Sequence, residues 1–282
     1  MRKLSLQRQT LRWCSLCLQL LRALWIVVRH YPSYTLEQQH AASQHWCQQT
    51  LQALGVQLQA QRPAVTDSTQ GGQLLVANHI SWLDVLVLNA YCPTDFVAKA
   101  EVQYWPVLGC LAKRNGTLFL PRHSPSQAQA MTELVAARLQ AGHTVLVFPE
   151  GSTSPGAGVL PFYPALFQAA VDAACPVQPL ALSYRHATGE ASRAAVYAGD
   201  TTLWQSLRRI MATPDLCAHI SVCPTIAYAP AHRRRHLARI THAAIAAQMQ
   251  QPIVVTAASA ALATGTSGRQ PSSTESAALL VH

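Results

Sequence analysis

The feature that most constrains the fold is a series of short, continuously apolar segments that alternate with helical patterns. We expect strands at residues 73–77, 94–98, 117–120, 144–148 and 177–183. Strands that are apolar at every position are buried on both faces, which is typical of a parallel sheet covered by helices. The sequence therefore predicts an α/β fold with a largely parallel central sheet flanked by helices.

Helix signals lie between and after these strands. Ser124 is a suitable N-cap, Pro125 takes the first helical position, Gln127 completes a capping box, and the helix is expected to stop at Gly142. A second helix is expected at residues 164–174. Weaker patterns predict a helix at 203–211, a strand at 219–223 and a basic helix that contains Arg233.

The amino-terminal part is basic and apolar. Before Asp67 the Lys and Arg residues are accompanied by one carboxylate, Glu37, and residues 13–28 form an apolar run interrupted by Arg22. A membrane span needs about 20 apolar residues. We therefore expect an interfacial helix on an anionic membrane surface, with a buried core helix and a signal peptide as the alternatives, in that order. A second helix is expected at residues 35–58.

Composition also favours contact with a membrane. Half of the 282 residues are hydrophobic and 12% are charged, while the formal net charge is +9. A basic chain can bind nucleic acid, but the leading segment is apolar between its charges, so we expect no nucleic-acid partner. From about residue 264 onward Gly, Ser and Thr dominate, which predicts a disordered tail.

His79 and Asp84 are the most informative candidates for chemistry. They are five residues apart, directly after the apolar segment 73–77. If a helix begins near Ser81, the Asp84 carboxylate can fold back to the imidazole and hold it as a proton acceptor. The alternative is that both residues only stabilise the start of a helix. Taken alone, the pair leaves these two interpretations equally open.

Further polar residues follow other predicted strands. Arg122 follows the strand that contains Phe119, and Lys99 follows the strand before it. Glu150, Gly151 and Ser152 follow the strand at 144–148. In parallel sheets, ligand sites lie beyond the carboxyl ends of the strands, so these segments are candidates for one site.

Taken together, the ordered segments resemble the glycerolipid acyltransferase family, of the lysophosphatidic acid acyltransferase type. The resemblance covers about residues 73–187 and rests on four blocks: His79 with Asp84, Gly116 with Phe119 and Arg122, residues 148–152, and the apolar block around Pro179. It implies transfer of a fatty acyl group from acyl-CoA or acyl carrier protein to the hydroxyl of a lysolipid. It also implies amino-terminal helices that hold the enzyme to the cytoplasmic face of the inner membrane.

The resemblance implies a role for each site residue. His79 is the general base and Asp84 orients it, and no other cofactor or metal is expected. Substrate-binding roles are implied for Phe119, Arg122, Glu150, Gly151 and Ser152. Lys99 is a further candidate from its place after a strand, where stabilising the oxyanion and being a solvated lysine are equally open. The corresponding domains are a membrane-association segment at 1–62, the acyltransferase domain at 63–250 and a low-complexity tail at 251–282.

Two positions depart from the family pattern. Pro121 precedes Arg122 where an acidic or amide residue is common, and Thr153 stands where members that make phosphatidic acid usually have arginine. One cation for an acceptor phosphate is therefore missing. The continuation after Ser154 is more similar to the branch that acylates lyso-ornithine lipid.

Other function classes stay open. A thioester or lipid hydrolase would use water in place of the acceptor hydroxyl, although the sequence has no Gly-x-Ser-x-Gly motif. A non-catalytic lipid- or metal-binding protein would use His79, Asp84 and Glu150 as ligands. Cys14 and Cys17 form a CxxC motif, but no second pair follows at zinc spacing.

Overall fold

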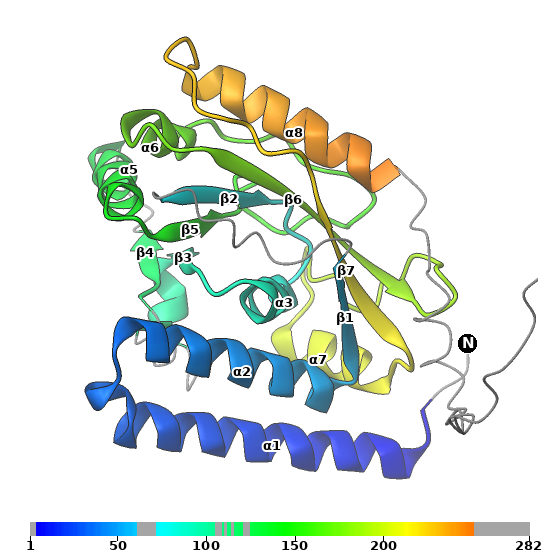
Figure 1. Ribbon diagram of the computed structural model, residues 1–282. Helices are drawn as coiled ribbons and strands as arrows, with labels where there is room; N and C mark the ends of the chain where they lie inside the picture. Colours follow the sequence, from blue (N-terminus) through cyan, green and yellow to red (C-terminus); the bar gives the residue numbers. More distant parts are fainter. Residues whose placement is uncertain are drawn as a thin grey trace, which may run out of the picture. The chain divides into compact units, whose positions relative to one another are not determined.

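A central, mostly parallel sheet organises the protein (Figure 1). The computed structural model describes residues 4–60, 72–104, 109, 112–113, 116–120 and 125–250. Within these residues seven strands pair in the order β1-β7-β6-β2-β5-β3-β4, and all neighbours are parallel except β6 and β7. The strands are β1 Val56–Ala60, β2 Gln73–Ala77, β3 Asp95–Lys99, β4 Leu118–Leu120, β5 Thr144–Val147, β6 Val177–His186 and β7 Leu216–Val222. The α/β fold with a largely parallel sheet is therefore confirmed.

Helices cover both faces of the sheet (Figure 1). On one face lie α2 Leu36–Leu54, α3 Leu83–Tyr91 and α7 Leu203–Ala212, and α1 Leu6–Arg29 packs outside this layer against α2. The other face packs against α5 Pro125–Gln140, α6 Phe167–Asp172 and α8 Arg234–Gln250. Short 3₁₀ turns are η1 Tyr31–Ser33 and η2 Ala100–Tyr104. Along β2, Leu74 and Val76 belong to one core while Leu75 and Ala77 belong to the other, which explains why this strand is continuously apolar.

The end of α2 corrects one expectation. The helix expected at 35–58 begins with a capping box between Thr35 and Gln38, but it ends at Leu54. Gly55 follows with a φ of 72°, a left-handed conformation that terminates helices and suits glycine. The chain then forms β1, which pairs with β7 at the edge of the sheet. Polar residues such as Gln57 and Gln59 alternate along β1, because an edge strand is less buried than the central strands.

Helix α1 is longer than the expected run 13–28 and lies along α2 (Figure 1). By length and composition alone it could cross a membrane. Only 17% of its apolar window is buried within the protein, so most of that window is exposed. Leu16, Ala23 and Val27 make up its buried side. Its outward side exposes Leu11, Leu18, Leu21, Trp25 and Val28. Such an unpartnered apolar side on a basic helix is typical of a membrane-associated segment.

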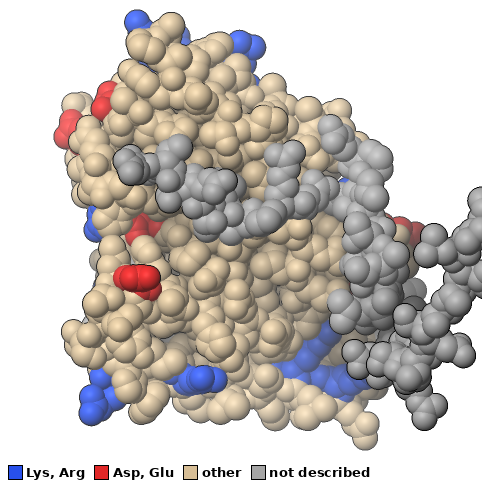
Figure 2. Space-filling model, in the orientation of Figure 1, with Lys and Arg blue, Asp and Glu red and all other residues tan. Residues whose placement is uncertain are grey.

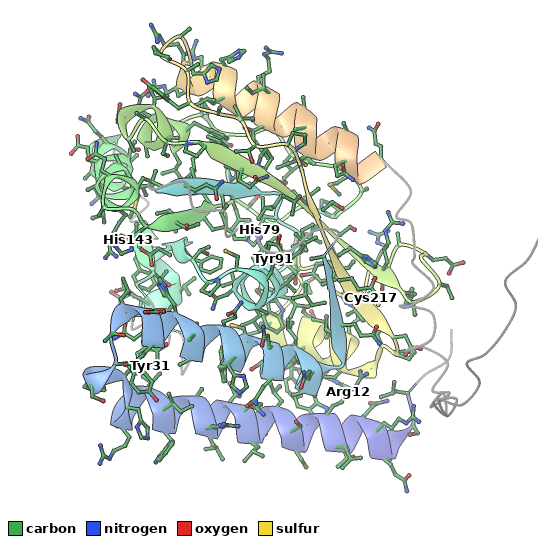
Figure 3. The ribbon with its side chains drawn as sticks, in the orientation of Figure 1. Arg12, Tyr31, His79, Tyr91, His143 and Cys217 are labelled. Carbon is green, nitrogen blue, oxygen red and sulfur yellow. The ribbon has the colours of Figure 1, made fainter. Side chains whose placement is uncertain are left out.

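Arg12 fastens α1 to the sheet domain (Figure 3). Its guanidinium donates hydrogen bonds to the carbonyl oxygens of Met211 at 3.0 Å and Thr213 at 2.9 Å, at the end of α7. The side chain also fills the space beside Gly55, where an added Cβ would lie 1.9 Å from Arg12 Nη2. Within Met1–Pro252 the described residues form one compact unit. The predicted boundary at residues 62 and 63 and the predicted tail lie outside the described residues.

Shortening Leu146 should measure how much the central sheet depends on its core. Leu146 on β5 is fully buried, so Leu146→Ala should lower the free energy of unfolding by about 2–5 kcal/mol in urea denaturation followed by circular dichroism. Leu134→Ala on α5, where the side chain is 44% exposed, is the matched control. An equal loss in both variants would contradict the assigned core.

Candidate active site

The end of β2 presents His79 at the centre of the sheet, between β5 and β6 (Figure 3). The preceding residue, Asn78, is fully buried and pairs with β6 through both halves of its amide. Its Nδ2 donates to the Leu182 carbonyl at 2.9 Å, and its Oδ1 accepts from the Leu182 N–H at 2.7 Å. The backbone from which His79 projects is therefore fixed on the β6 side.

His79 and Asp84 form the predicted pair. Asp84 lies in the first turn of α3, and its Oδ2 is 2.8 Å from His79 Nδ1. The same oxygen accepts the N–H groups of Ile80 at 2.6 Å and Ser81 at 2.9 Å, while Oδ1 accepts the Tyr184 hydroxyl at 2.6 Å. Two backbone N–H groups and the Tyr184 hydroxyl already use this carboxylate as an acceptor, so the tautomer that fits the geometry has Nδ1 as a fourth donor. His79 Nε2 is left as the proton acceptor.

Tyr184 is the site residue that sequence reasoning missed. It lies on β6, 100 residues beyond Asp84, and the expected strand stopped one residue before it. Burial, together with the charge of Asp84, raises the pKa of the Tyr184 hydroxyl well above 10, so the phenol stays neutral and donates. The one available sequence signal is the period of two that places Tyr184 on the same face as Leu180 and Leu182.

Glu150 holds His79 from the opposite side. It follows β5, is 3% exposed, and accepts the His79 N–H at 2.7 Å through Oε1 and the Leu160 N–H at 3.0 Å through Oε2. Burial raises the pKa of the Glu150 carboxyl, and the two backbone hydrogen bonds oppose that rise. The Ser154 N–H also donates to the His79 carbonyl at 2.7 Å. The segment after β5 is thus hydrogen-bonded to both the backbone N–H and the backbone carbonyl of His79.

The imidazole also has an aromatic neighbour. The Phe148 ring stacks on the His79 ring with centroids 4.1 Å apart and an interplanar angle of 17°. The His79 side chain remains 19% exposed, whereas that of Asp84 is fully buried. The stacked ring restricts rotation of the imidazole, and the residual exposure leaves access for a reactant.

The other predicted site residues lie at different distances from this centre. Gly151 follows Glu150 with a φ of 68°, and a Cβ there would lie 3.3 Å from the Tyr163 ring. Ser152 is exposed. Phe119 is half-buried on β4, which β5 and β3 separate from β2. Arg122 and the side chain of Lys99 lie outside the described residues.

The described part of the chain contains no group of three or more His, Cys, Asp or Glu side chains arranged to hold a metal ion. In the site itself, Asp84 and Glu150 direct their carboxylate oxygens to backbone N–H groups and to Tyr184 rather than to a shared point. The arrangement therefore offers a general base with two supporting carboxylates.

Comparison with known proteins decides the family. Over 174 residues the chain is 40% identical to the 1-acyl-sn-glycerol-3-phosphate acyltransferase of Neisseria meningitidis. The aligned region covers 61% of this chain and 67% of that protein. The chain belongs to the acyltransferase family. The family model described as "Acyltransferase" matches residues 53–183, which include His79, Asp84 and Glu150.

Other relatives of this acyltransferase differ in the acceptor that their names give. The lyso-ornithine lipid O-acyltransferase of Pseudomonas aeruginosa is 38% identical over 153 residues, 54% of this chain and 58% of that protein. The crystal structure of the 1-acyl-sn-glycerophosphate acyltransferase from Thermotoga maritima has a TM-score of 0.62 over 85% of this chain and 96% of that one. At 16% identity it shows a shared fold. The protein is thus an acyltransferase of lipid biosynthesis.

Removing the Tyr184 hydroxyl should destabilise the site. Tyr184→Phe leaves Asp84 Oδ1 buried without that donor, so the free energy of unfolding should fall by about 1–3 kcal/mol in urea denaturation. The exposed Tyr163 provides the matched control, because Tyr163→Phe removes the same atom from a side chain that is 68% exposed. A Tyr184→Phe variant as stable as this control would contradict the hydrogen bond.

Proposed function

We propose that this acyltransferase moves a fatty acyl group from acyl-CoA or acyl carrier protein to the hydroxyl of a lysolipid, with His79 as the general base. The observation that supports this role is the contact of His79 with Asp84, whose buried Oδ2 lies 2.8 Å from His79 Nδ1. An imidazole held in this way presents Nε2 to a hydroxyl proton near neutral pH.

The reaction needs no acyl-enzyme intermediate. His79 Nε2 takes the proton of the acceptor hydroxyl as the hydroxyl oxygen attacks the thioester carbonyl carbon. The tetrahedral intermediate then collapses, the carbon–sulfur bond breaks, and the imidazolium returns the proton to the leaving thiolate. Asp84 stabilises the imidazolium between these steps through its hydrogen bond with Nδ1.

Glu150 acts in this proposal as a positioning residue. Both of its oxygens already accept backbone N–H groups, one of them that of His79, so it fixes the backbone from which the imidazole projects. Arg122 would pair with an anionic part of the acceptor head group, with Phe119, Gly151 and Ser152 lining the acceptor site. Lys99 would stabilise the oxyanion of the tetrahedral intermediate.

The acceptor is either 1-acyl-sn-glycerol-3-phosphate or lyso-ornithine lipid. The names of the relatives support both, and Thr153 removes one cation that a phosphate-bearing acceptor would use. We place the enzyme on the cytoplasmic face of the inner membrane, where an anionic surface attracts its basic amino-terminal segment.

Replacing the proposed base should abolish most turnover without unfolding the protein. General-base catalysis contributes about 10²- to 10⁴-fold, so His79→Ala should lower kcat by that factor in an acyl-transfer assay. His45→Ala, at an exposed position on α2, is the matched control and should retain activity. Near wild-type turnover in His79→Ala would rule out the proposed mechanism.

A panel of substrates should identify the acceptor and separate transfer from hydrolysis. 1-Acyl-sn-glycerol-3-phosphate, lyso-ornithine lipid and other lysolipids would be supplied in parallel, with acyl-CoA and acyl-acyl carrier protein as donors. Release of free thiol should depend on a lysolipid, because the proposed base activates its hydroxyl. Thiol release at the full rate without any acceptor would instead identify a hydrolase.

A further inference from the structure

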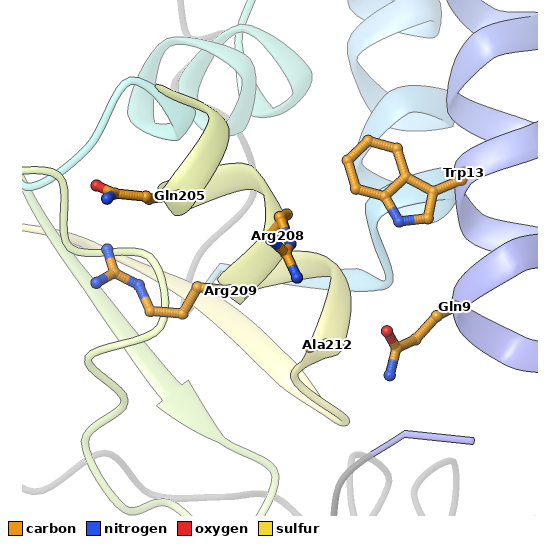
Figure 4. Close-up of a pocket in the computed structure, with 6 residues that line it drawn as sticks. All are labelled: Gln9, Trp13, Gln205, Arg208, Arg209 and Ala212. Atoms are coloured by element: carbon orange, nitrogen blue, oxygen red, sulfur yellow. The ribbon is translucent and has the colours of Figure 1, made fainter. Parts of the chain in front are cut away.

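A cavity of about 370 Å³ lies between α1 and α7, outside the site that contains His79 (Figure 4). Gln9 and Trp13 extend into it from α1. The α7 side is formed by Gln205, Arg208, Arg209 and Ala212. None of these residues has a role in the proposed acyl transfer.

The lining is cationic, and only part of its hydrogen-bonding capacity is used. Arg209 donates to the carbonyl oxygens of Ala194 and Val196, so its guanidinium is largely committed. Arg208 is exposed and has no partner among the residues that the structure describes. The described lining contains no carboxylate. A free guanidinium in a cavity without acidic groups is suited to an anion with several acceptor oxygens.

Two indole rings lie beside the cavity, one from α1 and one from α7. The ring centroids of Trp13 and of Trp204 on α7 are 5.1 Å apart, and the Trp204 side chain is 58% exposed. Beyond them runs the exposed apolar side of α1. On the face shown in Figure 2, Lys and Arg gather at the lower edge, over α1, and at the upper edge, over α8, while the described atoms visible between them are mostly uncharged. Indole rings beside exposed leucines are typical of a segment at the membrane–water interface.

We propose that the cavity between α1 and α7 binds the phosphate group of an anionic membrane phospholipid, with Arg208 donating to the phosphate oxygens. The apolar side of α1 selects a lipid over a free ion, because it contacts the acyl region when the helix lies in the interface. The flank of α1 that faces α7 is then at the level of the lipid head groups. The occupant is a bilayer lipid and is distinct from the acceptor at His79.

The cavity is physically linked to the catalytic segment. Trp82, between His79 and Asp84 in the sequence, donates from Nε1 to Ser206 Oγ of α7 at 3.0 Å. The loop held by Arg209 continues to Tyr197, whose N–H donates to the Ile80 carbonyl at 3.0 Å. A lipid bound at α7 therefore fixes the orientation of the catalytic segment relative to the membrane surface.

Vesicle binding by the full chain tests the site without any turnover. The apparent affinity for phosphatidylglycerol vesicles, measured by co-sedimentation, should fall about fivefold in Arg208→Gln, the loss expected for one cation at the membrane surface. Arg235→Gln on α8 removes the same charge at another exposed position and should bind like the wild type. Equal losses in the two variants would show attraction by net charge alone and overturn the proposal.

Two further measurements keep the inference testable. Ala212→Leu fills part of the cavity and keeps every charge, so it should also weaken binding to phosphatidylglycerol vesicles while the melting temperature stays near the wild-type value. Wild-type affinity in a folded Ala212→Leu variant would overturn the assignment of the cavity. Inorganic phosphate at matched ionic strength should not displace the protein from vesicles, and displacement would show that the cavity takes the free ion instead of a lipid.

Discussion

The buried carboxylate of Asp84 is the constraint on which the rest of the site depends. Burying a charged carboxylate away from water costs several kcal/mol of folding free energy unless hydrogen-bond donors fill nearly all of its acceptor positions. Here the donors come from the end of β2, the turn before α3, and β6. Those elements must keep their relative positions for the charge to stay satisfied. Because burying Asp84 is costly without these donors, the imidazole is held in one orientation.

Glu150 repeats this principle on the other side of His79, with a different balance. Asp84 accepts from a side-chain hydroxyl and the imidazole as well as from backbone groups, whereas Glu150 accepts from two backbone N–H groups and has a raised pKa because of its burial. The two carboxylates therefore fix the backbone and the ring of the same residue separately. The ring is held from the first turn of α3, and the main chain is held from the segment that follows β5.

Local chemistry was predictable from the sequence, and contacts between distant strands were not. The apolar segments predicted β2 and β5, and the short spacing of His79 and Asp84 predicted their pairing, because both depend on neighbours in the chain. The sequence did not predict β1, because its formation depends on the end of α2 at Gly55 and on pairing with β7, 160 residues away. Tyr184 was missed for the same reason: its partner is set by the order of strands in the sheet. The substrate roles of Arg122, Lys99, Phe119, Gly151 and Ser152 stay predictions.

The contact between Arg12 and the end of α7 has a practical consequence for protein production. An apolar leading helix is a common target for truncation when a soluble fragment is wanted. In this protein α1 covers Trp46 and Leu51 of α2, and the Trp46 indole donates to the Gln19 carbonyl of α1 at 3.0 Å. Cutting the helix away would uncover that apolar surface, empty the space beside Gly55 and leave the last carbonyls of α7 without their donor. α1 is an integral wall of the enzyme as well as its proposed contact with lipid, so a detergent that shields its outer side is the better route to a purified, folded chain.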